Sequence, residues 1–192
     1  MPEYRRRLPH FHRDGAYLFL TWRLWGSLRK PSPRFYPTPG HAFVAADRLL
    51  HRDRSGPLWL SQPRIARLVV DTIIAGEHER GFYELSAWAI MPNHVHLLIL
   101  PRITVAKIMR WLKGSTARQA NQLLERTGLP FWQDESYDHW VRNGKEFGRI
   151  ISYIEENPVS AGLVGWPWTS GVWQAQPPAP PRPQLPSARP EM

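Results

Sequence analysis

The sequence predicts one α+β domain in which helices cover an antiparallel sheet, of the ferredoxin-like or RNA-recognition-motif-like type. Segments rich in aromatic and branched residues alternate with segments of helical periodicity, in the order strand, helix, strand, strand, helix, strand, helix. Only Pro92-Asn93 separates the two middle strands, which indicates a tight antiparallel connection.

The first half of the chain supplies a strand and two helices. Tyr17–Trp25 is rich in aromatics and leucine and predicts the first strand. Residues 29–41 carry four prolines and are expected to form a loop. A short helix is predicted over Ala42–Asp53, with one apolar side formed by Phe43, Ala46, Leu49 and Leu50. A second helix is expected from Ser61, its N-cap, to Gly76, with apolar residues Ile65, Leu68, Val69 and Ile73.

Two strands and a long helix follow. The strands are predicted over Tyr83–Met91 and His94–Leu100. The helix is predicted over Thr104–Arg126, with a buried stripe of Val105, Ile108, Met109, Leu112, Ala120 and Leu123.

The last elements are a short strand and a capped helix. Ser136–Arg142 predicts the strand. Asn143 is expected to be the N-cap of the helix, with Glu146 completing a capping box. The helix is expected to end near Glu156, before Pro158, because the residue before a proline disfavours the helical conformation.

Composition indicates the extent of the domain, the class of its partners and the kinds of site that are excluded. The globular domain is assigned to residues 1–173 of 192, and residues 174–192 are expected to be a proline-rich disordered tail. The net charge of +9 and the pI near 10.5 predict a polyanionic partner, and nucleic acid is the common one. With no cysteine, disulfides and thiolate metal sites are excluded. No secretory signal and no apolar run of about 20 residues is present, so we expect a cytoplasmic protein without a membrane span.

Two histidines are the sharpest local feature of the sequence. Residues i and i+2 of a strand point to the same face, so His94 and His96 project together and could bind one divalent metal ion. An HxH pair alone is a weak signal, and His10-Phe11-His12 repeats it within the basic N-terminal segment.

A tyrosine and an asparagine share one surface of the last helix. Tyr153 and Asn157 are four residues apart at the edge of its apolar stripe, and are therefore neighbours. Two imidazoles and an amide oxygen would leave metal positions open for phosphate oxygens, and the phenol could attack the phosphorus. This layout is workable for phosphoryl transfer through a phosphotyrosine.

Four separated segments resemble the REP-associated tyrosine transposases: AWAIMPNHVHLLI (87–99), LKGSTARQAN (112–121), FWQDESYDHWVR (131–142) and YIEENPVSAGLV (153–164). The resemblance implies an HUH-endonuclease fold and cleavage and joining of single-stranded or hairpin DNA through a 5′-phosphotyrosine. By position it implies that His94, His96 and Asn157 bind Mg²⁺ or Mn²⁺ and that Tyr153 is the nucleophile. It leaves open whether the protein is a monomer or a homodimer.

The basic residues of the long helix gain a role from this resemblance. Lys107, Arg110, Lys113 and Arg118 could follow DNA phosphates, although a solvated helix face has the same composition. Arg5 to Arg7 could form an arm that reaches the DNA. Two alternatives remain: a non-catalytic DNA- or RNA-binding protein on the same fold, and a metal-dependent phosphodiesterase in which water attacks.

Overall fold

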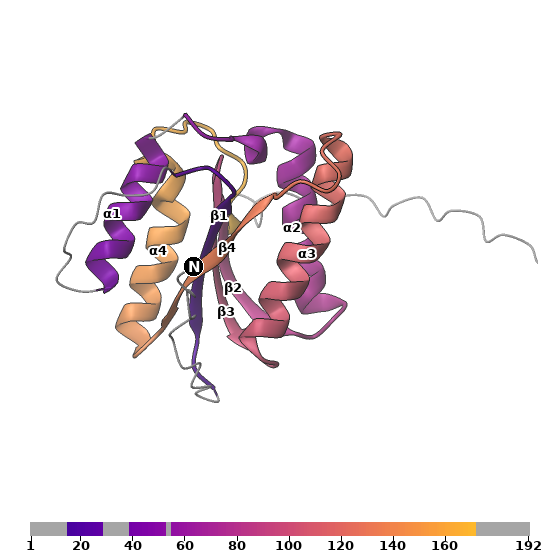
Figure 1. Cartoon of the computed structure of the whole chain (residues 1–192). Coiled ribbons are helices and arrows are strands. Elements are labelled where there is room, and N and C mark those ends of the chain that lie inside the picture. The colour runs from indigo at the N-terminus through magenta and orange to yellow at the C-terminus, as the bar shows by residue number, and fades with distance from the viewer. Residues whose placement is uncertain (1–14, 29–38, 53–54, 172–192) are drawn as a thin grey trace, which may run out of the picture.

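The computed structural model describes residues 15–28, 39–52 and 55–171 and confirms the predicted α+β class. One antiparallel sheet has the strand order β2-β3-β1-β4 and is made of β1 (Leu18–Leu24), β2 (Tyr83–Ile90), β3 (His94–Pro101) and β4 (Trp132–Trp140). The helices are α1 (Pro39–Arg52), α2 (Pro63–His78), α3 (Val105–Leu123) and α4 (Gly144–Ser160), and a 3-10 turn at Trp59–Ser61 precedes α2. Helices α2 and α3 cover one face of the sheet, whereas α1 and α4 lie side by side over the other (Figure 1).

Each face of the sheet has its own core, because successive strand residues point to opposite sides. The larger core joins α2 and α3 to strand residues such as Leu18, Leu20, Val95 and Leu97. The smaller one, under α1 and α4, is built on Phe19, Ala87, Ala89, Leu98 and Ile154. Beside it lie buried polar side chains, among them Asp47, His94, His96 and Asn157.

The two histidines of β3 lie on the face covered by α1 and α4, as the strand periodicity predicts. In the pairing of β1 with β3, Thr21 lies opposite His96 and Arg23 lies opposite His94. The strand is central, so its backbone is paired on both edges and its side-chain directions are fixed. Both imidazoles are fully buried.

Helix α1 differs from its prediction in both position and orientation. It begins at Pro39 and not at Ala42, because proline is tolerated in the first turn, where no backbone donor is needed. Leu49 was predicted to be buried but is 42% exposed, whereas Asp47 is only 3% exposed. The helix therefore turns a polar residue, and not its full apolar stripe, toward the sheet.

Other boundaries also differ from their predictions. The residue that caps α2 is Gln62 and not Ser61, since Pro63 occupies the first helical position. Strand β4 begins at Trp132 and not at Ser136, because its first residues already pair with β1 and the Trp132 indole donates to Thr116. Helix α4 continues through Pro158 to Ser160.

Of two further predictions on helix ends, the one on α3 was wrong and the one on α4 is confirmed. Leu123, predicted as part of the buried stripe of α3, is 41% exposed in the last turn of that helix. The predicted N-cap of α4 is confirmed: the Asn143 side chain accepts a hydrogen bond from the Glu146 backbone N–H at 2.9 Å. The Glu146 carboxylate accepts in return from the Arg142 backbone N–H.

Several expectations fall on residues outside the described ranges. These are the arm at Arg5 to Arg7, most of the proline-rich loop at 29–41, and the tail at 174–192 with its boundary near Trp173. Within the described ranges, no helix is both long enough and apolar enough to span a membrane.

Two glycines in helix interiors give a test of the packing. A Cβ atom at Gly76 would lie 2.1 Å from the Tyr83 hydroxyl, whereas one at Gly114 would meet nothing within 4 Å. We expect Gly76→Ala to lower the free energy of unfolding by about 1–3 kcal/mol through overpacking. Gly114→Ala, its control, should raise it by about 0.5–1 kcal/mol through helix propensity. Urea denaturation measures both, and a stabilising Gly76→Ala would contradict the Tyr83 packing.

Candidate functional site

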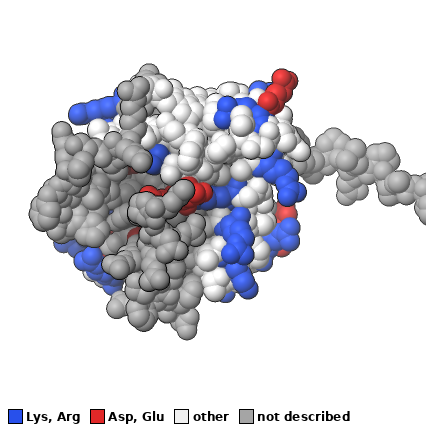
Figure 2. Space-filling view, in the orientation of Figure 1, with Lys and Arg blue, Asp and Glu red and all other residues white. Residues whose placement is uncertain are grey.

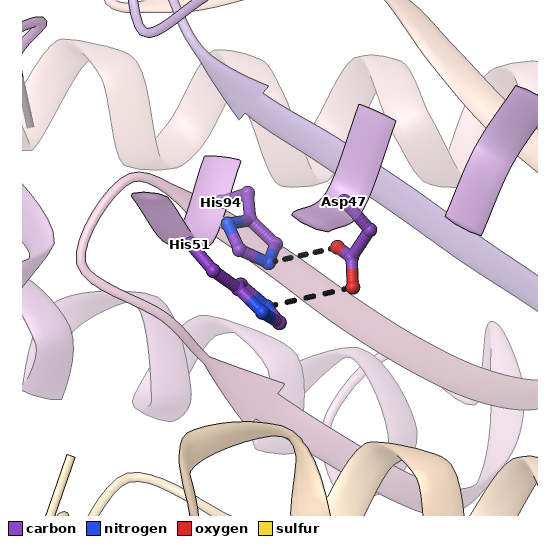
Figure 3. A group of neighbouring side chains, drawn as sticks. All are labelled: Asp47, His51 and His94. Atoms are coloured by element: carbon purple, nitrogen blue, oxygen red, sulfur yellow. Dashed lines mark ion pairs between the residues drawn. The ribbon is translucent and has the colours of Figure 1, made fainter. Parts of the chain in front are cut away.

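Four buried polar side chains meet between the sheet and the helices α1 and α4. Asp47 comes from α1, His94 and His96 from β3, and Asn157 from α4, and each is at most 3% exposed. His51, one turn after Asp47, borders the group, and Figure 3 shows its ring and that of His94 pointing at the Asp47 carboxylate. Segments far apart in the sequence thus contribute to one site.

The imidazoles are oriented by hydrogen bonds at their Nδ1 atoms. His94 Nδ1 donates to Asn93 Oδ1 at 2.6 Å, and His96 Nδ1 pairs with Thr21 Oγ1 at 2.8 Å. Partners of this kind fix the ring and direct the other nitrogen toward a ligand. The two Nε2 atoms consequently approach each other to 3.0 Å.

The Asp47 carboxylate faces the histidine pair with one oxygen and the nucleophile candidate with the other. Its Oδ1 lies 3.3 Å from the Nε2 atoms of both His94 and His96. Its Oδ2 accepts hydrogen bonds from the Tyr153 hydroxyl and, at 3.3 Å, from Asn157 Nδ2. His51 Nε2 lies 3.0 Å from Asn157 Oδ1, so both ends of that amide are engaged.

Burial sets the protonation of the group. Burial lowers the pKa of His94 to about 4, against the opposing effect of Asp47, so its Nε2 keeps a free lone pair at neutral pH. Burial alone would raise the pKa of Asp47, but the neighbouring imidazoles outweigh it, and the net pKa lies well below the ordinary value. Burial and the Asp47 charge raise the pKa of Tyr153, whereas Asn157 and Arg48 act in the opposite direction. At neutral pH the site therefore holds a carboxylate beside a protonated phenol.

The donor set fits a divalent metal ion. Asp47 Oδ1 is buried without a hydrogen-bond partner, which is costly unless a cation complements it. With the two Nε2 atoms it forms a triangle with edges of 3.0, 3.3 and 3.3 Å. Adjacent ligands of an ion with bonds of about 2.1 Å lie roughly 3.0 Å apart in octahedral geometry. Donor atoms of Asp47, His51 and His94 also lie within 4.8 Å of one another.

Tyr153 is held by aromatic packing at the edge of this group. Its ring lies 6.1 Å from those of Phe19 and Phe43 and 5.7 Å from that of His96, measured between centroids. The side chain is half-buried. The structure thus brings together Tyr153, His94, His96 and Asn157, the four residues expected at the reaction centre.

The predicted DNA-binding residues lie elsewhere. Lys107, Arg110 and Arg118 are exposed on α3, on the opposite side of the sheet from the histidines. Lys and Arg side chains gather over that α2 and α3 side in Figure 2. Lys113 is different, because its ammonium donates to the carbonyl oxygens of Gln133 and Asp134 at 2.9 and 3.0 Å.

Sequence reasoning missed Asp47 and His51. They are four residues apart on α1, a spacing that places them on one helix face. Their four-residue spacing could have indicated a polar side of the helix that faces the site. The apolar residues of the same segment instead predicted that a different side is buried.

A cavity of about 110 Å³ adjoins the site beside His51 and His94. Its apolar wall includes Leu50, Met91, Leu163 and Trp166.

Comparisons with known proteins identify the family of this chain. The family model described as "Transposase IS200 like" matches residues 64–157, which include both histidines, Tyr153 and Asn157. A REP-associated tyrosine transposase of Escherichia coli (strain K12) is 30% identical over 143 residues, covering 71% of this chain and 79% of the relative. The fold matches a solved REP-associated tyrosine transposase bound to a REP hairpin, with a TM-score of 0.56, 22% identity, and coverage of 88% of this chain and 82% of that one. The chain therefore belongs to the REP-associated tyrosine transposases of the IS200-like transposase family.

Proposed function

We propose that this chain cuts and rejoins single-stranded DNA beside a hairpin, through a covalent bond between Tyr153 and a 5′-phosphate. The observation that carries the proposal is the hydrogen bond from the Tyr153 hydroxyl to Asp47, whose other oxygen faces both imidazoles. A nucleophile and a candidate metal site are thus joined through one carboxylate. The family membership supports the same chemistry.

The proposed reaction divides between the nucleophile and the metal ligands. Tyr153 Oη loses its proton and forms a bond to phosphorus while the bond from phosphorus to the 3′ oxygen breaks. The 3′ oxygen takes up one proton in exchange and leaves as a hydroxyl. His94 and His96 would hold Mg²⁺ or Mn²⁺ through their Nε2 atoms. When bound, such an ion offsets the negative charge that develops on the phosphate. Asn157 stays a candidate ligand; its amide now hydrogen bonds with Asp47 and His51.

Access to the site requires α1 to move. Both imidazoles are fully buried, and the helix that carries Asp47 and His51 lies between them and the solvent. We therefore propose that DNA binding shifts α1 only far enough to admit one phosphate, while Asp47 stays within reach of the histidines and Tyr153. The cavity beside His51 and His94 lies on the side where a flanking nucleotide could enter.

The substrate class follows from the relatives. The solved structure that shares this fold is bound to a REP hairpin. For this chain we propose single-stranded or hairpin DNA, with the exposed basic residues of α3 contacting a part of the DNA remote from the cut. A monomer or a homodimer could carry out the reaction.

A non-catalytic DNA- or RNA-binding role is the second candidate. The burial of both imidazoles favours it, because the reaction centre is closed in this conformation. Formation of a covalent protein–DNA adduct distinguishes the two roles, and cleavage without an adduct would indicate a phosphodiesterase.

Tyr153→Phe tests the nucleophile. It removes one oxygen and keeps the ring contacts with Phe19, Phe43 and His96. Cleavage of a labelled hairpin oligonucleotide with Mn²⁺ should fall by at least about 10³-fold, while DNA affinity stays the same. The assay is a denaturing gel on which the wild type gives a protease-sensitive adduct band.

Tyr137→Phe is the matched control, because its ring stacks on Phe43 at 4.2 Å beside the same site. It should keep the adduct. An adduct that persists in Tyr153→Phe and disappears in Tyr137→Phe would transfer the role of nucleophile to Tyr137.

The salt dependence of DNA binding tests the basic face of α3. Each phosphate contact contributes about one to the slope of log affinity against log salt concentration. Lys107→Ala should therefore reduce the slope by about one. Lys113→Ala should leave the slope unchanged and lower the melting temperature, because Lys113 binds backbone carbonyls of β4. Equal slopes for the wild type and Lys107→Ala would exclude Lys107 from the DNA interface.

A further inference from the structure

Asp47 lies outside the residues matched by the family model and outside the four sequence segments that resemble the family. The family model begins at residue 64, and the four sequence segments that resemble the family begin at residue 87. Yet Asp47 is the most connected side chain of the site: its two oxygens face His94, His96, Tyr153 and Asn157. A residue so placed, on a helix that covers the site, requires its own explanation.

We propose that Asp47 is shared between the metal ion and the nucleophile. Its Oδ1 is the third protein ligand of the divalent cation, beside the Nε2 atoms of His94 and His96. Its Oδ2 positions Tyr153 by accepting the hydrogen bond of the hydroxyl. The positioning of Tyr153 by Oδ2, the catalytic half of this role, rests on the proposed function. The ligation of the cation by Oδ1, the metal half, rests on the geometry of this chain.

Three observations favour Asp47 over Asn157 as the third ligand. Asp47 Oδ1 is equidistant from the two Nε2 atoms, at 3.3 Å, and lacks a hydrogen-bond partner. Both ends of the Asn157 amide are occupied, one by His51 and the other by Asp47 itself. A carboxylate also suits Mg²⁺ and Mn²⁺, which two imidazoles alone would select poorly.

The position of α1 is fixed by the same residues that orient the histidines. Asn93 accepts from His94 Nδ1 and donates through Nδ2 to the Leu50 carbonyl of α1 at 2.9 Å. One side chain thus sets the direction of an imidazole and anchors the helix that brings Asp47. Asn93 therefore helps to place the Asp47 carboxylate beside the two imidazoles, although Asp47 belongs to a helix and the imidazoles to the sheet.

Isothermal titration with MnCl₂ in the absence of DNA tests the metal half on the full chain. Asp47→Asn keeps the shape of the side chain and should weaken Mn²⁺ binding by at least about 100-fold. Asn157→Ala, which removes only a partner of the carboxylate, should weaken it less, by roughly 10-fold, as is typical of outer-shell partners. Asp71→Asn on α2, the control, should have no effect. A larger loss for Asn157→Ala than for Asp47→Asn would overturn the assignment.

Two further measurements separate ligation from positioning. In a Tyr153→Phe background, Asp47→Asn should cause the same loss of Mn²⁺ affinity, since ligation does not need the phenol. In EDTA, the decreases in melting temperature caused by Asp47→Asn and Tyr153→Phe should be less than additive, because the two residues share one hydrogen bond. Additive decreases would overturn the positioning half.

These measurements need no cleavage and so distinguish this proposal from the proposed function. A wild type that binds Mn²⁺ through Asp47 but never forms an adduct would contradict the transferase proposal and leave the metal half standing. A wild type that forms the adduct while Asp47→Asn binds Mn²⁺ normally would contradict the assignment of Asp47 alone.

Discussion

The site depends on one buried carboxylate. Moving an ionised group out of water costs several kcal/mol unless partners replace its hydration. Asp47 has such partners on its Oδ2 side, where the hydroxyl of Tyr153 and the amide of Asn157 donate. On its Oδ1 side it has two imidazoles at 3.3 Å and no hydrogen bond. That asymmetry is the strongest reason to regard the group as a cation site.

The rest of the fold holds the sheet and the helices α1 and α4 in place around this carboxylate. Strand β3 is central in the sheet, so the direction of its two histidines is fixed by pairing on both edges. Thr21 on β1 and Asn93 before β3 then fix the rings. Helix α4 supplies the phenol and the amide, so the candidate metal ligands and the proposed nucleophile converge without any loop residue among them. Sites on helices and strands can be held more closely than sites on loops.

The same packing bears on the two features that we propose for the reaction, a bound cation and a shift of α1. Burial, together with the charge of Asp47, raises the pKa of Tyr153, which keeps the phenol in its unreactive form. A cation bound at Asp47 would counter that charge. The buried position of the histidines shields them from solvent but also from DNA. Chemistry at this centre is therefore coupled, in our account, to the displacement of α1.

Local sequence patterns predicted those features of the site that depend on the geometry of a single strand or helix. The shared face of His94 and His96 follows from the two-residue period of a strand, and the proximity of Tyr153 to Asn157 follows from one helical turn. Asp47 could not be predicted in this way, because its partners on α4 lie 106 and 110 residues away in sequence. The apolar residues of α1 even suggested that Leu49 is buried, whereas the polar group on β3 is complemented by Asp47. The polar contacts of Asp47 with residues far away in sequence thus decided which side of α1 is buried, against the apolar pattern of the helix.

Anomalous diffraction from crystals grown with Mn²⁺ tests the assignment of the metal site directly. We predict one anomalous peak bonded to the Nε2 atoms of His94 and His96 and to Asp47 Oδ1, at about 2.1–2.2 Å from each. The Tyr153 hydroxyl should lie next to the second carboxylate oxygen. A peak bonded to Asn157 with Asp47 turned away, or no peak at the two imidazoles at saturating Mn²⁺, would contradict it.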